Sequence, residues 1–236
     1  MKDLILLTDK LGLVGMKPQL TELINITNEP YVGAVIEVLK KLFTTECEYK
    51  KSRSLCYRIE LAKFPSIKLL SDTSQAKLVQ NIDLQQVVDN RENMMFIGGP
   101  GSGKTHLALG LAFVAIERGY RVRFYTLNGL ATQLLNARIH NYETKFINSM
   151  KRFNLIVVDE LGYVPIKREA QFMLFELFAK LYEQSSLIIT TYLKFEEWGD
   201  MFGSSRSTKA IIDRLTHRCQ IIETGNKSFR GGADVK

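Results

Sequence analysis

The chain has 236 residues, 45% of them hydrophobic, which is enough to bury the core of one large domain or of two smaller ones. Its three cysteines have no paired spacing and predict neither a disulfide framework nor a zinc site. The apolar runs are too short for a signal peptide or a membrane span, so we expect a soluble cytoplasmic protein without a membrane partner. A net charge of +7 favours, but does not require, a polyanionic partner.

Residues 1–65 are predicted to form a small helical domain that contacts a partner or DNA. Apolar residues recur at helical spacing over Leu4–Val14, and a longer helix is expected to begin at Pro30. Residues 66–236 are expected to form the second domain, with the boundary near Pro65.

Two parts of the chain could contact DNA. Residues 40–68 carry eight basic and three acidic residues with tyrosines among them, which suits a DNA or partner surface but also a solvated helix face. Residues 94–236 carry 19 basic and 13 acidic residues, so the second half has most of the net charge. The pattern does not choose between the two parts.

The second domain contains a phosphate-binding motif at residues 98–105. It matches G-x-x-x-x-G-K-[ST] between a strand predicted over 93–97 and a helix predicted over 106–118. This context directs backbone N–H groups and a helix N-terminus at a phosphate. Lys104 is expected to reach the β- and γ-phosphates of ATP, and the Thr105 hydroxyl to be a ligand of Mg²⁺. The predicted nucleotide ligands in this stretch are Gly98, Gly99, Pro100, Gly101, Ser102, Gly103, Lys104, Thr105 and His106.

Strands and helices alternate after this motif. Strands are predicted over 121–126, 155–158, 187–191 and 219–223, and helices over 130–139, 144–151, 169–183, 195–202 and 209–216. This alternation predicts an α/β fold in which a parallel five-stranded sheet lies between helices. Ligand chemistry is then expected at the carboxyl ends of the strands.

An acidic pair, Asp159 and Glu160, follows the strand over 155–158. Asp159 is expected to lie beside the Mg²⁺, and Glu160 to orient or deprotonate the water that attacks the γ-phosphate. The alternative role, two carboxylates that cap a loop, is weaker because a P-loop precedes them. Transfer of the phosphate to another substrate requires that water be excluded from the γ-phosphate. A glutamate beside the metal ligand instead favours hydrolysis.

Four arginines lie after the fourth predicted strand: Arg206, Arg214, Arg218 and Arg230. An ATPase that works as a ring or helix of subunits needs an arginine offered to the γ-phosphate of a neighbouring subunit. The residue pattern alone does not select among the four.

Several stretches of the chain resemble IstB, the ATP-dependent helper of bacterial insertion sequences that encode an IstA-type transposase. They are residues 98–108, 158–165, 195–198 and 210–218. IstB is similar in turn to DnaC, the replicative helicase loader, and both are AAA+ ATPases. The resemblance covers essentially the whole chain but is weaker before residue 65.

The resemblance implies an AAA+ domain without a C-terminal lid domain, behind a small helical domain. It also implies a homo-oligomer that forms on double-stranded DNA with ATP, hydrolyses ATP and recruits and stimulates a transposase at the target site in bacterial cytoplasm. By position, Arg214 matches the arginine finger and Arg230 the second sensor arginine.

One position departs from the pattern of the family. After the fourth strand, relatives usually carry Thr-Ser-Asn, with asparagine as first sensor of the γ-phosphate, whereas this chain has Thr190-Thr191-Tyr192. A tyrosine cannot occupy the place of an amide, so we expect ATP binding to persist and hydrolysis to be weak, with Thr191 as a candidate substitute. Two alternatives stay open: a DnaC-like helicase loader, which the similarity to DnaC allows, and an ATP-gated DNA-binding scaffold with little hydrolysis, which Tyr192 allows.

Overall fold

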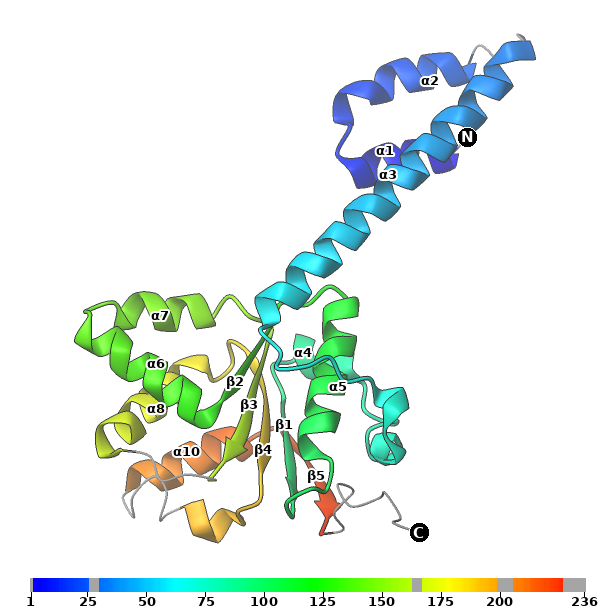
Figure 1. The fold of residues 1–236 in the computed structure, drawn as a ribbon. Coiled ribbons are helices and arrows are strands. Elements are labelled where there is room, and N and C mark those ends of the chain that lie inside the picture. The colour runs from blue at the N-terminus through cyan, green and yellow to red at the C-terminus, as the bar shows by residue number, and fades with distance from the viewer. Residues whose placement is uncertain (1, 26–29, 163–166, 199–205, 227–236) are drawn as a thin grey trace. The chain divides into compact units, whose positions relative to one another are not determined.

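The computed structural model describes residues 2–25, 30–162, 167–198 and 206–226. The chain divides into two compact units, Met1–Tyr57 and Arg58–Lys236 (Figure 1). The division falls within helix α3 (Pro30–Ala62), before the boundary predicted near residue 65. The helix continues past the division because no proline interrupts it between its first residue and Pro65.

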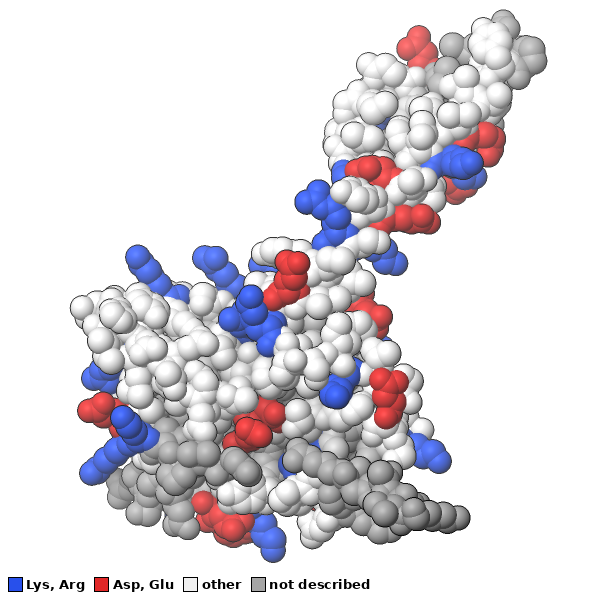
Figure 2. Space-filling view, in the orientation of Figure 1, with Lys and Arg blue, Asp and Glu red and all other residues white. Residues whose placement is uncertain are grey.

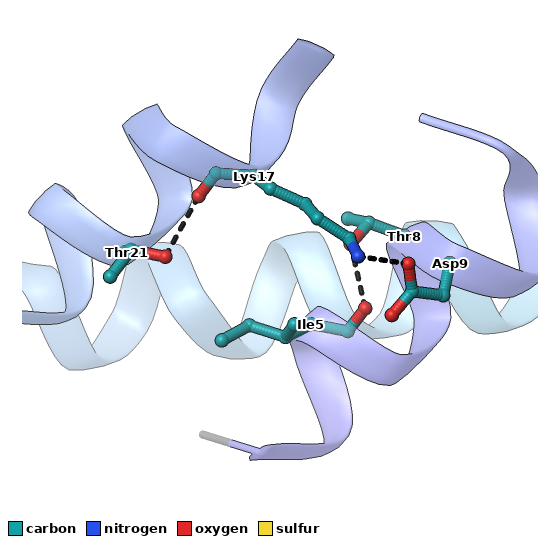
Figure 3. A network of polar contacts seen from close by, with 5 residues as sticks. All are labelled: Ile5, Thr8, Asp9, Lys17 and Thr21. Atoms are coloured by element: carbon teal, nitrogen blue, oxygen red, sulfur yellow. Dashed lines mark hydrogen bonds and ion pairs between the residues drawn. The ribbon is translucent and has the colours of Figure 1, made fainter. Parts of the chain in front are cut away.

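The smaller unit is helical. Helices α1 (Lys2–Leu11) and α2 (Lys17–Asn25) are separated by the short 3-10 turn η1 (Val14–Met16) and are followed by α3. Among its described residues, the buried side chains are Leu4, Thr8, Leu11, Leu20 and Val32. In Figure 3, Lys17 at the start of α2 forms an ion pair with Asp9 of α1, and its carbonyl accepts a hydrogen bond from Thr21. The ion pair joins the first two helices, and the hydrogen bond lies within the first turn of α2.

The larger unit contains a five-stranded sheet with the strand order β2-β3-β4-β1-β5. The strands are β1 (Asn93–Gly98), β2 (Val122–Thr126), β3 (Leu155–Leu161), β4 (Ser186–Thr191) and β5 (Cys219–Gly225). All neighbouring strands are parallel. The predicted parallel five-stranded sheet is therefore confirmed.

Helices cover both faces of this sheet (Figure 1). They are α4 (Leu84–Asp89), α5 (Lys104–Glu117), α6 (Leu127–Ile139), α7 (Glu143–Met150), α8 (Arg168–Leu181) and α10 (Arg206–Thr216), with 3-10 turns η2 (Leu70–Asp72), η3 (Ser74–Leu78) and η4 (Phe195–Glu197). On one face, strand residues such as Ile156 and Ile189 pack with α6 and α8 in the main core, and α5 contacts the sheet on the other face. The residues from Leu155 to Val158 are fully buried, as expected for a central strand covered on both sides.

Two details differ from the sequence-based expectation. Helix α4 was not predicted because residues 66–93 are polar and mixed, but Asp83 caps its first turn by accepting from Gln85 N and Gln86 N. The helix predicted over 195–202 is seen only as η4 and the buried Trp198, since residues 199–205 lie outside the described part of the chain. Within the described residues, no helix is both long and apolar enough to cross a bilayer.

Candidate nucleotide-binding site

The motif at residues 98–105 forms a tight loop between β1 and α5. Gly101 and Gly103 have φ angles of +77° and +87°, a region that favours glycine. The helix begins at Lys104, so its N-terminal backbone N–H groups open toward the loop. The ammonium of Lys104 donates hydrogen bonds to the carbonyls of Gly98 (2.8 Å) and Gly99 (2.7 Å). This arrangement places a positive charge and a helix N-terminus at one point, which suits a phosphate.

The end of strand β5 packs against the phosphate loop. The hydroxyls of Ser102 and Thr224 lie 2.6 Å apart in a buried contact, and Gly99 N donates to Gly225 O over 3.0 Å. A Cβ atom on Gly98 would lie 2.3 Å from Thr224 Oγ1, so a side chain does not fit there without displacement. The shape of the phosphate loop therefore depends on a strand that lies far along the chain.

The acidic pair lies at a break in the register of β3 with β4. The register shifts between Val158 and Leu161, and Glu160 takes a left-handed φ of +62°. Asp159 is 4% exposed, and its Oδ1 accepts a hydrogen bond of 2.9 Å from the Thr105 hydroxyl. Glu160 is exposed and lies in the wall of the cleft above the loop. Strained backbone of this kind is often found at functional sites.

Thr190, at the end of β4, contacts both members of the acidic pair. Its hydroxyl donates to Asp159 Oδ1 and accepts from Glu160 N over 3.0 Å. The hydroxyl of its neighbour Thr191 donates instead to Leu161 O (2.9 Å) and accepts from Leu193 N (3.0 Å). Sequence reasoning missed Thr190, because only the pairing of β3 with β4 brings its hydroxyl to the acidic pair.

Tyr192 stands where the resemblance leads one to expect asparagine. Its side chain is 43% exposed, and its hydroxyl donates to the carbonyl of Gly162 over 2.7 Å. This bond joins the loop after β4 to the loop after β3. The tyrosine thus contributes to the wall of the site through its ring while its hydroxyl contacts backbone.

A cleft of about 640 Å³ opens over the phosphate loop. It is lined by residues 100–106, by Glu160 and residues 190–192, and by Lys68, Asp72, Thr73 and Ser74. His106 holds the segment around residues 68–74 near the loop, because its Nε2 donates a hydrogen bond to the carbonyl of Leu69 (2.8 Å). The segment before α4 therefore forms one wall of the site, although nothing in its sequence indicated this.

The structure brings most of the predicted site residues together, and among the described ones it leaves Arg214 apart. Residues 100–106 and Glu160 line the cleft, Asp159 is bonded to Thr105, and Gly98 and Gly99 pack against the end of β5. Arg214 is exposed on the last turn of α10 and does not line the cleft of its own chain. Arg230 lies outside the described residues.

A family model and the individual relatives identify the same protein family. The family model described as IstB-like ATP binding protein matches residues 7–235. The chain is 32% identical over 202 residues to the protein named as the ATP-binding protein of insertion sequence IS5376 from Geobacillus stearothermophilus, covering 82% of this chain and 80% of that one. It is 31% identical over 201 residues to the corresponding protein of insertion sequence IS21 from Pseudomonas aeruginosa, covering 82% and 76%.

Solved structures show the same fold at lower identity. The DnaC helicase loader matches with 19% identity and a TM-score of 0.51, covering 69% of this chain and 94% of that one. AMPPCP-bound DnaA from Aquifex aeolicus matches with 21% identity and a TM-score of 0.53 over 68% of this chain. The chain spans about half (51%) of that DnaA structure. The fold is thus that of the P-loop AAA+ proteins, and the chain belongs to the family of IstB-like ATP binding proteins.

Proposed function

We propose that this chain hydrolyses ATP, assembles as a homo-oligomer on double-stranded DNA and recruits an IstA-type transposase to its target site. The observation that supports hydrolysis is the exposed Glu160 in the wall of the phosphate cleft, next to a buried aspartate that is bonded to the P-loop threonine. A carboxylate at this place is what a hydrolase needs to orient or deprotonate water.

The oxygen atoms around Asp159 suit Mg²⁺. Asp159 Oδ1 and the Thr105 hydroxyl are hard oxygen donors 2.9 Å apart, beneath the place expected for the phosphates. Mg²⁺ is usually held by one or two protein oxygens and takes its other ligands from the phosphates and water. When bound, the ion would neutralise charge on the phosphate oxygens. Thr105 and Asp159 are the residues that would hold it.

The roles of the remaining residues follow from their positions. The Lys104 ammonium would exchange its contacts with Gly98 and Gly99 for the β- and γ-phosphates. Glu160 would hold the attacking water. Arg214 would reach the γ-phosphate of a neighbouring subunit, in keeping with its exposed position away from its own cleft.

Thr190 is a better candidate than Thr191 to support hydrolysis in place of the usual asparagine. Both hydrogen bonds of the Thr191 hydroxyl are to backbone groups, since it donates to Leu161 O and accepts from Leu193 N. The Thr190 hydroxyl bridges the carboxylate of Asp159 and the backbone of Glu160. We therefore assign Thr190 a positioning role for both acidic residues.

DNA binding and transposase recruitment are supported by family membership and by charge. The relatives are named for insertion sequences, and the chain carries a net charge of +7. On the face shown in Figure 2, described basic residues are scattered and do not form one patch.

The test is phosphate release from ATP by the purified chain, with and without long duplex DNA, with Glu160→Gln as the matched control. Turnover that rises with duplex DNA and is lost in Glu160→Gln supports the proposal. Stimulation by single-stranded DNA alone would favour a helicase loader. ATP-dependent DNA binding without turnover above the level of the control would contradict hydrolysis.

One observation favours the ATP-gated scaffold as a second candidate. The Tyr192 hydroxyl contacts the Gly162 carbonyl, so the usual sensor position does not present an amide to the γ-phosphate. In a scaffold, bound ATP would order the cleft and the assembly without being consumed. A tightly bound, unhydrolysed ATP in each subunit of the DNA complex would support this candidate.

A further inference from the structure

Helix α5 holds the segment before α4 through two positions on one of its faces. His106 and Gly110 are four residues apart and are therefore neighbours along the helix surface. His106 Nε2 donates a hydrogen bond to the carbonyl of Leu69 (2.8 Å). A Cβ atom on Gly110 would lie 2.6 Å from Leu70 Cδ2, so Leu70 fills the notch that this glycine leaves in the helix surface. The two contacts fix adjacent residues of the segment, which lies beside α5 in Figure 1.

The bond from His106 ends on the carbonyl that also closes turn η2. Leu69 O accepts a second hydrogen bond from Asp72 N (3.1 Å), and this second bond forms the turn. Farther along the segment, Gln75 Cγ lies 3.6 Å from the position that a Cβ atom on Gly103 would take. The segment is thus packed on α5 from Leu69 to Gln75, and His106 holds the turn within it.

This segment and the acidic pair lie on opposite sides of the phosphate loop. In the strand order β2-β3-β4-β1-β5, the strands that carry Glu160 and residues 190–191 lie on one side of β1. Strand β5 lies on the other side of β1 and contacts η3. Because the phosphate loop follows β1, the cleft extends from the acidic pair, over the loop, to residues 68–74.

A nucleotide whose γ-phosphate lies at Glu160 directs its ribose and base to residues 68–74. This step rests on the function proposed above, which places the γ-phosphate there. A nucleoside triphosphate carries its γ-phosphate and its nucleoside at opposite ends, and the loop would hold the phosphates between them. The far wall offers hydrogen-bonding groups of Lys68, Asp72, Thr73 and Ser74. A few polar groups placed in this way are what orient a small ligand in its cleft.

The backbone and the side chain of His106 serve different parts of the site. Its backbone N–H belongs to the first turn of α5, which opens toward the phosphates. Its imidazole is bonded instead to the carbonyl of Leu69. Replacement of the side chain therefore leaves the phosphate-binding backbone in place and releases turn η2.

We propose that His106 is a positioning residue for the nucleoside half of the bound nucleotide. Its bond to Leu69, together with the notch at Gly110, holds residues 68–74 where the ribose and base can touch them. ATP then gains affinity from its ribose and base beyond the affinity of its phosphates. Without the bond, the segment moves away from α5 and this part of the affinity is lost.

The test compares two probes by calorimetric titration of the full chain with Mg²⁺ present. AMPPCP is an ATP analogue that resists hydrolysis, and inorganic tripolyphosphate carries the phosphates without ribose or base. The unmodified chain should bind AMPPCP at least about tenfold more tightly than tripolyphosphate. His106→Ala should weaken AMPPCP about threefold to tenfold, the value of one hydrogen bond, and tripolyphosphate by less than about twofold.

Three variants serve as controls. His106→Gln places an amide N–H donor near the position of Nε2 and should recover AMPPCP affinity to within about twofold. Lys104→Ala should weaken both probes, because its ammonium meets the phosphates. His140→Ala removes an exposed histidine that does not line the cleft and should change neither affinity.

Gly110→Ala moves the same segment without removing a hydrogen-bonding group. The new Cβ would lie 3.0 Å from Leu70 Cγ as well as 2.6 Å from Cδ2, so Leu70 must shift. Alanine favours a helix, and the variant is expected to fold. It should weaken AMPPCP about threefold and leave tripolyphosphate unchanged. The double variant His106→Ala/Gly110→Ala should lose less affinity than the product of the two single effects, because both act on one segment.

Four results would overturn the proposal. Equal affinity of the unmodified chain for the two probes would exclude a contact with the nucleoside. Equal weakening of both probes in His106→Ala would show that His106 acts on the phosphates. AMPPCP affinity that His106→Ala leaves unchanged, or that His106→Gln does not recover, would show that the bond does not position the segment. Single effects that multiply fully in the double variant would show that His106 and Gly110 act on different segments.

These measurements are independent of the wider proposal for the chain. None of them requires hydrolysis, DNA or assembly. A chain that binds AMPPCP but neither hydrolyses ATP nor binds DNA would contradict the proposed function and leave the role of His106 to be decided by the two probes.

Discussion

The hydroxyl of Thr190 offers a sharp test of how the acidic pair is held. Thr190→Val keeps the shape of a side chain that is 1% exposed but removes both of its hydrogen bonds. Asp159 loses a donor, and Glu160 N loses its acceptor. Thr191→Val is a matched control, since it also removes one donated and one accepted bond from a buried threonine one residue away.

The two variants should lose similar stability but differ in activity. A hydrogen bond to a charged acceptor contributes roughly 1.5–3 kcal/mol, and an unpaired buried N–H costs about 1–3 kcal/mol. Because such terms are not additive, we expect a loss of about 3 kcal/mol for Thr190→Val and about 2 kcal/mol for Thr191→Val. Turnover should fall about 10- to 100-fold only in Thr190→Val, since it alone frees the residues that hold Mg²⁺ and water.

The assays are urea unfolding for stability and phosphate release at varied Mg²⁺ for activity. Thr190→Val should require more Mg²⁺ for half-maximal turnover. Thr190→Ser keeps the hydroxyl and should therefore restore both the turnover and its Mg²⁺ dependence. Equal turnover in the two valine variants would refute the positioning role, whatever their losses of stability. So would a normal Mg²⁺ dependence in Thr190→Val.

Three other predictions concern the same site. Glu160→Gln should keep ATP binding while lowering turnover at least about 100-fold, and equilibrium binding of a fluorescent ATP analogue separates the two effects. Gly98→Ala should lower ATP affinity at least about tenfold, because its Cβ would lie 2.3 Å from Thr224 Oγ1. ATP affinity equal to that of the unmodified chain would show that β5 can move away without distorting the loop. Arg214→Ala and Lys104→Ala should each be inactive alone, yet their mixture should regain turnover if the arginine acts on a neighbouring subunit. A mixture that stays inactive would contradict that role.

Local sequence patterns were enough to predict the sheet and the phosphate loop. The glycines, lysine and threonine of residues 98–105 must be contiguous to surround a phosphate, so the motif carries its own geometry. The buried strand at residues 155–158 places the acidic pair at a sheet edge by the same local logic. Family resemblance then added Arg214, which no local pattern distinguishes from the other late arginines.

The rest of the site depends on pairings between distant segments. Thr190 and Thr191 are adjacent residues of the same type. Only the register of β3 with β4 determines that Thr190 bonds to the acidic pair while Thr191 bonds to a backbone carbonyl. The contribution of residues 68–74 to the cleft rests on their packing near α5 and on one bond from His106. Likewise, the apolar residues of α3 form one broad set in the sequence and separate into inward and outward stripes only in the folded unit.

The place of β1 in the sheet has a consequence for synthesis of the protein. Both neighbours of β1 come from later in the chain, and the buried bond from Leu187 N to Asn93 Oδ1 already spans 94 residues. The contact between Ser102 and Thr224 spans 122 residues. Since a chain is made from its N-terminus, the ribosome has completed the motif long before the strands that shape it exist. A nascent chain that ends before β5 therefore carries the sequence of a nucleotide loop without its support, and we expect ATP to bind only after β5 has emerged.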